Sequence, residues 1–312
     1  MKRNLLIVLC VLRLFCLDAR ADEKRELKKI SDHVWAYTNV SPKTVTNSFG
    51  ANAGVIVGEK GVLVVDTLSS AKAGKQFLAD IRKVTKLPIL WVVNTHFHFD
   101  HSWGNCVFVD EGARVIGASP GAKLLAKSGP IEIAQYRKND VMQKVLEGTT
   151  ITPATVSFTG TITLDLGGVT IELYAFPAAH APDNLMVWVP QDKVLFSGDL
   201  LFVGCHPFLG EGNLQNWDLD LNTIAAMKAE KIVPGHGPLA TVKDIEQMKA
   251  YLAAFDKNAK ELAQGKTQND AAELAKELEK RLPDQGRKEL RGMIEHNLRL
   301  KYLPRKKKTA GK

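Results

Sequence analysis

The stretch NTHFHFDHSWGN, residues 94–105, decides how this sequence is interpreted, because it places three histidines and an aspartate within six positions. The whole chain of 312 residues contains only eight histidines. Charged imidazoles at this density would repel one another, and neutral imidazoles are poor occupants of an apolar strand. Neutral imidazole and carboxylate groups are, however, ligands that zinc prefers in proteins. The stretch therefore predicts a metal site.

The residues before this stretch predict the class of fold. An apolar run over residues 87–94 predicts a strand that ends where the histidines begin. Residues 61–66 predict an earlier strand, and residues 71–85 predict a helix between the two. An order of strand, turn, helix and strand is typical of an α/β core.

Three more candidate ligands follow apolar runs in the second half of the chain: His180, Asp199 and His236. We expect each of them where a strand ends and a loop begins, because ligand sites in α/β folds form at such ends.

The spacing inside the histidine stretch suggests two metal ions. His96 and His98 are two residues apart, so in an extended segment their side chains point to the same side and can hold one ion. Asp100 and His101 follow a turn and can reach a second ion nearby. Six consecutive residues cannot fill two coordination shells, and the three distant candidates can complete them.

The order HxHxDH, a lone histidine, Gly-Asp and then PGHG resembles the metal motif of the metallo-β-lactamase superfamily over residues 32–240. The resemblance implies an α/β fold, an αββα sandwich of two mixed sheets with flanking helices. It also implies two zinc ions per chain. His96, His98 and His180 would bind the first ion, Asp100, His101 and His236 the second, and Asp199 would bridge both.

The resemblance implies a hydrolase that uses a metal-bridging hydroxide to cleave an amide- or ester-like carbonyl bond, with Asp100 as the catalytic residue that orients the nucleophile. β-Lactams, thioesters and lactones are the expected small-molecule substrates. The commonest β-lactamase subclass has a cysteine in place of Asp199 and no histidine matching His101. The presence of both residues resembles glyoxalase II-like thioesterases and lactonases. The whole pattern is most similar to exported zinc hydrolases found near quinoprotein and sulfur-oxidation systems.

Two other classes of function are open at this point. One is an iron-dependent oxidoreductase of the same superfamily that acts on sulfur compounds and uses a single iron. The other is a non-catalytic metal-binding protein. A complete second-metal set favours hydrolysis, and metal analysis would discriminate between one iron and two zinc ions.

Several residues near the motif have two possible roles. His206, Asn213 and Trp103 are candidate substrate contacts, because loop residues around a rigid site often touch the ligand. Packing or backbone hydrogen bonding is the alternative for His206 and Trp103. Asp66 is either structural or a hydrogen-bonding partner that orients a ligand. Cys205 is either a pocket residue or a packed thiol, and its pairing with Cys106 is open.

The two ends of the chain differ from its body. Residues 1–21 are expected to be a signal peptide ending in Ala19-Arg20-Ala21, with an uncleaved anchor as the alternative, and the mature protein is expected to be periplasmic or secreted. No stable membrane span is expected after cleavage. We expect a catalytic domain over 22–242, a helical extension over 243–303 and a basic tail over 304–312. The extension is either a cover for the core or an appendage, with helices expected near 270–281 and over 287–300.

The net charge of +8 belongs to the ends. Residues 301–312 contribute +6 and residues 1–21 contribute +3, so the rest of the chain is nearly neutral at −1. Nucleic-acid binding requires a basic stripe on a folded surface, and the body of this chain has none. We therefore expect no nucleic-acid partner.

Overall fold

Twelve strands form two sheets in the computed structural model, which describes residues 25–42 and 45–304. The first sheet has seven strands in the order β1 to β7. They are β1 (Lys28–Lys29), β2 (Val34–Tyr37), β3 (Ala53–Val57), β4 (Val62–Val65), β5 (Ile89–Asn94), β6 (Arg114–Ala118) and β7 (Val156–Phe158). Neighbours from β1 to β4 are antiparallel and those from β4 to β7 are parallel, so the sheet is mixed.

The second sheet has five strands in the order β12-β11-β10-β9-β8. They are β8 (Gly160–Asp165), β9 (Thr170–Phe176), β10 (Asn184–Val189), β11 (Val194–Phe202) and β12 (Lys231–His236). Only the pair β11–β12 is parallel. Strands β10 and β11 form an antiparallel hairpin with its turn at residues 190–193.

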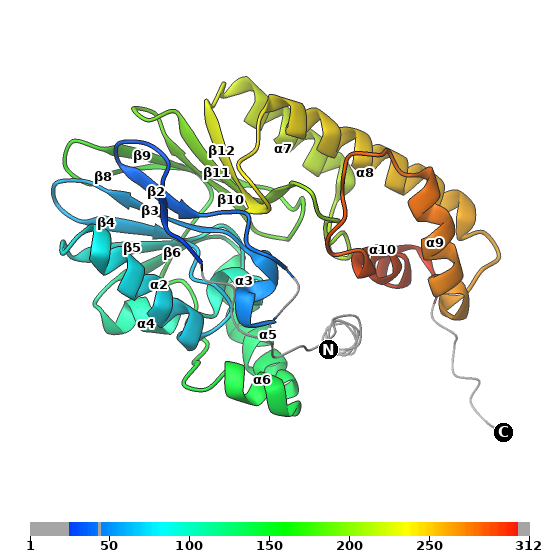
Figure 1. Ribbon diagram of the computed structural model, residues 1–312, viewed down its shortest axis with the longest axis horizontal. Helices are drawn as coiled ribbons and strands as arrows, with labels where there is room; N and C mark the ends of the chain where they lie inside the picture. The colour runs from blue at the N-terminus through cyan, green and yellow to red at the C-terminus, as the bar shows by residue number, and fades with distance from the viewer. Residues whose placement is uncertain (1–24, 43–44, 305–312) are drawn as a thin grey trace.

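The inner faces of the two sheets pack against each other and form one apolar core. It contains Ile56, Leu63 and Val93 from the first sheet together with Leu173, Val187, Val189, Phe196 and Val233 from the second. Most of these residues are β-branched or aromatic, which suits a pleated and buried surface. Figure 1 shows the two sheets as adjacent layers with helices on their outer sides, which confirms the predicted αββα sandwich.

Helices α2 (Ala71–Val84) and α4 (Asn105–Asp110) cover the outer face of the first sheet. The side chain of Ser70 accepts a hydrogen bond from the Ala73 amide and so begins α2. Phe77 and Ile81, one helical turn apart, are fully buried on that face.

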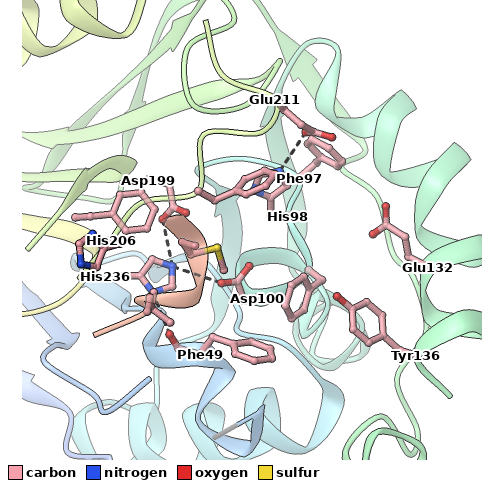
Figure 2. A pocket seen from close by; sticks show the side chains of 15 residues that line it. Phe49, Phe97, His98, Asp100, Glu132, Tyr136, Asp199, His206, Glu211 and His236 are labelled. Atoms are coloured by element: carbon pink, nitrogen blue, oxygen red, sulfur yellow. Dashed lines mark hydrogen bonds and ion pairs between the residues drawn. The ribbon is translucent and has the colours of Figure 1, made fainter. Parts of the chain in front are cut away.

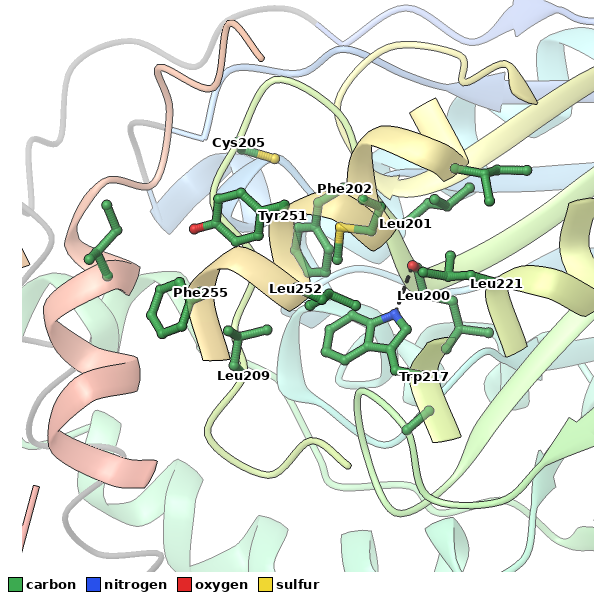
Figure 3. Close-up of a cluster of buried hydrophobic side chains, with 14 of the residues drawn as sticks. Leu200, Leu201, Phe202, Cys205, Leu209, Trp217, Leu221, Tyr251, Leu252 and Phe255 are labelled. Atoms are coloured by element: carbon green, nitrogen blue, oxygen red, sulfur yellow. Dashed lines mark hydrogen bonds between the residues drawn. The ribbon is translucent and has the colours of Figure 1, made fainter. Parts of the chain in front are cut away.

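Helices α7 (Leu214–Ala226) and α8 (Val242–Leu262) cover the outer face of the second sheet. Trp217, Tyr251 and Phe255 belong to the apolar cluster that these helices share with β11. Figure 3 shows this cluster and the hydrogen bond in which Trp217 Nε1 donates to the Leu200 carbonyl at 2.9 Å. The buried indole therefore has a polar partner, as a large core aromatic requires.

Two helices that the sequence analysis did not predict lie beside the strand ends: α5 (Gly121–Tyr136) and α6 (Asp140–Val145). They carry a smaller apolar cluster with Trp103, Leu125, Ile133 and Met142. This cluster supports the loop that contains the histidine stretch, because Phe97 belongs to it. A short helix, α3 (Phe99–Ser102), continues that loop.

The C-terminal region contains η2 (Gln268–Asp270), α9 (Ala271–Arg281), α10 (Gly292–Asn297) and a π-helical turn, η3 (Leu298–Tyr302). The helix expected near 270–281 is confirmed. The helix predicted over 287–300 is wrong at its start, because it begins at Gly292. The backbone before it pairs with another segment. The Lys288 amide donates to the Gly204 carbonyl at 2.9 Å, and Glu289 forms an isolated parallel β-bridge with Cys205. An amide committed to that pairing cannot join a helix.

Among the helices of the described ranges, none has both the length and the apolar character needed to cross a membrane. The expected signal peptide lies outside the described residues, as does the basic tail apart from Pro304.

Candidate metal centre

The candidate site lies where parallel strands end. Strands β4 and β5 are parallel neighbours that end at Val65 and Asn94, so the residues that follow them meet at one edge of the sheet. The histidine stretch leaves this edge after β5, and α3 then carries Asp100 and His101. His236 is the last residue of β12 in the other sheet. The site is therefore shared between the two layers.

The seven residues predicted as ligands come together in two groups. The ligand atoms in each group lie within 4.8 Å of one another. The first group is His96, His98, His180 and Asp199, and the second is Asp100, His101 and His236. Their role as ligands stays a prediction, but their convergence from four separate parts of the chain is a property of the fold.

In the first group, four side chains surround one point. His180 Nε2 lies 3.1 Å from His98 Nδ1. Asp199 Oδ2 lies 3.3 Å from His180 Nε2 and 3.7 Å from His96 Nε2. Three imidazole nitrogens and one carboxylate oxygen are a suitable set for a tetrahedral ion.

In the second group, His236 Nε2 lies 3.4 Å from Asp100 Oδ2 and 3.4 Å from His101 Nε2. The other oxygen of Asp199, Oδ1, lies 3.2 Å from His101 Nε2 and 3.5 Å from His236 Nε2. Asp199 thus turns one oxygen toward each group, which is the geometry of a bridging carboxylate. Figure 2 shows Asp199, His236 and Asp100 on one side of the pocket.

Asp199 was expected at the end of a strand. It lies instead inside β11, three residues before the strand ends at Phe202. The pairing of β11 with β12 shifts on both sides of Gly198, whose φ of +52° is the reason that regular pairing breaks there. Gly235 on β12 completes the arrangement, because a Cβ atom at that position would lie 1.8 Å from Asp199 Oδ1. Gly235 of the PGHG motif therefore makes room for the carboxylate, whereas a Cβ atom on Gly198 of the SGD motif would lie 2.6 Å from Thr95 Cβ.

Each of the five histidines uses its second ring nitrogen to contact the protein. These contacts are His96 Nδ1 with Thr95 Oγ1 at 3.1 Å, His98 Nε2 with Glu211 Oε2 at 3.3 Å, His101 Nδ1 with Asp66 Oδ2 at 2.8 Å, His180 Nδ1 with the Phe208 carbonyl at 3.1 Å, and His236 Nδ1 with the Phe49 carbonyl at 3.2 Å. Such outer partners orient a ligating imidazole and select its tautomer. The remaining nitrogen of every ring faces the centre.

Asp66 contacts the ring of a predicted ligand directly. Its carboxylate accepts hydrogen bonds from the Thr95 amide at 2.8 Å and the Thr95 hydroxyl at 2.7 Å, and its Oδ2 pairs with His101. The two roles considered for Asp66 are thus combined, because the same carboxylate holds the loop after β5 and orients the imidazole of His101.

The residues of this centre suit a divalent metal. His96 Nε2 and Asp199 Oδ1 are buried, and neither has a hydrogen-bond partner among the described residues. Burial lowers the pKa of His180 to about 3, and burial together with His101 holds the pKa of His96 well below its usual range. Burial raises the pKa of Asp199, but the facing imidazoles, His101 first, bring it well below the ordinary value. Burial opposes it, but the facing carboxylates raise the pKa of His101 and His236. The neutral nitrogens of His96 and His180 and the ionised carboxylate of Asp199 are donors that zinc binds.

A pocket opens over the centre. Its walls are formed by Phe49, Phe97, His98, Phe99, Asp100, Glu132, Tyr136, Asp199, Phe202, His206, Phe208, Glu211, His236, Leu290 and Met293. Two predicted ligand residues from each group are on this list, so a molecule in the pocket would touch the candidate metal centre. The remainder of the wall is largely aromatic.

The three candidate substrate contacts have different positions. His206 lines the pocket, and its Nδ1 lies 2.8 Å from the Tyr251 hydroxyl. Trp103 is only 1% exposed and packs against the rings of Phe99 and Tyr136, which corresponds to the packing alternative. Asn213 caps α7 by accepting hydrogen bonds from the amides of residues 215 and 216, and it borders a different, shallow groove.

The C-terminal region forms part of the pocket wall through Leu290 and Met293 and is therefore more than an appendage. Arg287 attaches it to the loop after β11, since its Nη1 donates to the carbonyls of Phe202 at 2.8 Å and Cys205 at 2.7 Å. The guanidinium also lies over the ring of Tyr251 at 4.8 Å.

Cys205 and Cys106 are free thiols. Cys205 is buried in the apolar cluster under α8, and burial raises the pKa of its thiol to about 12. This position corresponds to the packed-thiol alternative.

Three further residues that no sequence motif predicted line the pocket: Glu132, Glu211 and Tyr136. Glu211 follows Asp199 by twelve residues in a Gly-rich loop, and Glu132 lies on an unpredicted helix. Neither position has a motif or spacing that would distinguish it from a surface glutamate.

Comparison with known proteins agrees with this geometry. A profile of the metallo-β-lactamase superfamily matches residues 47–236. A type 2 metallo-β-lactamase of Elizabethkingia meningoseptica is 26% identical over 243 residues, which cover 76% of this chain and 89% of that protein. Two solved structures share the fold: a metallo-β-lactamase from Pontibacter korlensis (TM-score 0.61, 24% identity, covering 74% of this chain and 99% of that one) and DIM-1 metallo-β-lactamase exposed to ceftazidime (TM-score 0.59, 22% identity, 75% and 98%). From the profile match over more than half of its length and the convergent histidine and aspartate groups, we conclude that this chain belongs to the metallo-β-lactamase superfamily.

Proposed function

We propose that this protein is an exported hydrolase that holds two zinc ions and cleaves an amide- or ester-like carbonyl bond. The observation that carries the proposal is the orientation of Asp199, whose two oxygens face two separate groups of candidate ligands. A site for a single ion would not require His101 and His236 in addition to the first group. Export is proposed from the expected signal peptide, and an amino terminus at Asp22 in the mature protein would support it.

When bound, a zinc pair supplies a water of lowered pKa and a Lewis acid for the carbonyl oxygen. The chain's own groups would do the rest. Asp100 Oδ2, which faces His236 and lines the pocket, is placed to accept a proton and orient the attacking water. The enclosed apolar wall reduces the access of bulk water to the reacting groups.

The substrate is proposed by class. The similarity to metallo-β-lactamases favours a β-lactam amide, whereas the presence of both His101 and Asp199 favours a thioester or a lactone. All three bonds present a carbonyl to the same nucleophile, so the centre can serve each of them. The pocket that surrounds the centre must therefore select among them.

The test is metal analysis of the purified mature protein, followed by assays with a cephalosporin, a thioester and a lactone, each with and without chelator. We expect about two zinc ions per chain and chelator-sensitive hydrolysis of at least one compound. A protein with one iron and no hydrolytic activity would favour the oxidoreductase alternative instead. A protein that binds zinc but hydrolyses none of the three would favour the non-catalytic alternative.

A further inference from the structure

One wall of the pocket combines carboxylates with aromatic rings. Glu132 from α5 and Glu211 from the loop after β11 both line it, and no lysine or arginine is present among its described residues. In the view of Figure 2 the two glutamates lie on the side away from His206 and His236. Glu211 pairs with the ring of His98. Glu132 is half-buried and is not among the predicted metal ligands.

Three rings of the pocket wall pack against one another. Phe49 and Phe99 are in edge contact with centroids 5.4 Å apart, and Phe99 and Tyr136 are also 5.4 Å apart. A fourth ring, Phe208, lines the pocket beside His98, at a centroid distance of 5.7 Å. Aromatic faces attract cations, and several such faces together with a carboxylate are a known chemistry for recognising alkylammonium groups.

The charge of Glu132 has a cost in the free protein. Burial is the largest influence and raises its pKa; His98 and the Ser128 hydroxyl act against this rise, and the nearby charge of Glu211 adds to it. A carboxylate held near an apolar wall is unfavourable unless a cation approaches it. A second polar group of the pocket also lacks a partner: His206 is 3% exposed and lines the pocket, and its Nε2 has no hydrogen-bond partner in the described part of the chain.

We propose that the substrate carries an alkylammonium group, which binds against Glu132 and the aromatic wall while the carbonyl lies over the metal centre. This inference rests on the proposed function and names its substrate class: a cationic, apolar ester, thioester or lactone. His206 Nε2 supplies a polar contact to the same molecule from the opposite side. A substrate that carries a carboxylate at the ammonium position would be repelled by both glutamates.

The direct test is binding to the zinc-loaded full chain. The probes are 4-(trimethylammonio)benzyl alcohol and its neutral isostere 4-tert-butylbenzyl alcohol, measured by isothermal titration calorimetry. They have the same shape and differ in charge, so their affinity ratio reports the electrostatic contribution. We expect the cation to bind at least about 10-fold more tightly, in the range typical of a desolvated cation–π and carboxylate site.

Glu132→Gln should remove most of this preference while the neutral probe binds as before. Glu132→Asp, which keeps the charge, should retain part of it. Glu147→Gln is the matched control, because Glu147 is exposed and does not line the pocket. Circular dichroism and zinc content identify a variant that has failed to fold. Equal affinity for the two probes in the wild type, or an unchanged ratio in a folded and zinc-loaded Glu132→Gln, would overturn the inference.

A second measurement separates this inference from the proposed function. Hydrolysis of acetylthiocholine is compared with that of its neutral isostere, 3,3-dimethylbutyl thioacetate. We expect a higher kcat/KM for the cation in the wild type and a smaller ratio in Glu132→Gln. If neither compound is hydrolysed but the cationic probe still binds more tightly, the ammonium site stands and the thioester activity does not. If both are hydrolysed equally, the hydrolase stands and the ammonium site does not.

Discussion

The two sides of the pocket differ in how their polar groups are satisfied. On the metal side, each histidine has a protein partner for one ring nitrogen and directs the other toward the centre. On the aromatic side, Glu132 has no lysine or arginine beside it among the described pocket residues. The comparison indicates that the chain arranges the metal side in advance and leaves the aromatic side to be completed by a ligand.

The largest effect is expected from Asp199→Asn, which tests whether the metal side depends on one bridging group. The amide cannot offer an anionic oxygen to both groups, so the zinc content should fall and hydrolysis should drop more than about 100-fold, beyond what loss of an outer partner costs. His96→Ala should act similarly. The fold should remain because the core lies between the sheets. Plasma emission analysis and kcat/KM are the measurements, and wild-type turnover by either variant would disprove the site assignment.

Gly235→Ala tests the same carboxylate without changing a ligand. The new methyl group would be 1.8 Å from Asp199 Oδ1, so the carboxylate must move and bridging should be lost. We expect a loss of about one zinc ion per chain and of most activity. Gly117→Ala on β6 is the control, because its nearest contact is Ala154 Cβ at 3.2 Å. Two tightly bound zinc ions in Gly235→Ala would show that the glycine is not required.

A smaller effect is expected from Asp66→Asn, which removes an outer partner and leaves the ligands in place. His101 would lose the carboxylate that orients its ring at 2.8 Å, and outer partners of this kind typically account for about 10–100-fold in metal affinity or activity. Competition with a zinc-binding dye measures the affinity. Asp165→Asn is a suitable control, because Asp165 pairs with Lys60 far from the site at the surface. Unchanged zinc affinity would mean that Thr95 and the loop alone position His101.

The metal centre should be affected least by Arg287→Ala. This substitution weakens the attachment of the C-terminal region that forms part of the pocket wall. Two carbonyls would lose a charged donor, so the free energy of unfolding should fall by about 2–3 kcal/mol. Zinc content should be unchanged, and KM should rise because Leu290 and Met293 lose their support. Urea unfolding and steady-state kinetics check both. Arg291→Ala, which breaks only the exposed pair with Glu279, should change stability by about 0–1 kcal/mol. Equal destabilisation by the two variants would contradict this role.

The metal ligands could be predicted from the sequence, whereas the exact position of one of them in the fold could not. The metal side was predictable because its residues are close together in the chain or belong to short motifs at strand ends, where the chemistry of zinc limits the choice of residue. The position of Asp199 inside β11 was not predicted, because the break in pairing at Gly198 depends on the neighbouring strand.

The sequence by itself determined the α/β class, the histidine and aspartate set and the order in which they occur. The tertiary structure decided that Glu132, Tyr136 and Met293 share one pocket, although they are far apart in the chain and lie in no motif. It also decided that Arg287 holds an extended segment in place of a predicted helix. The physical reason is that a ligand set is limited by local geometry and by metal chemistry, whereas a pocket wall is formed by long-range packing, which leaves no periodic or spaced pattern in the sequence.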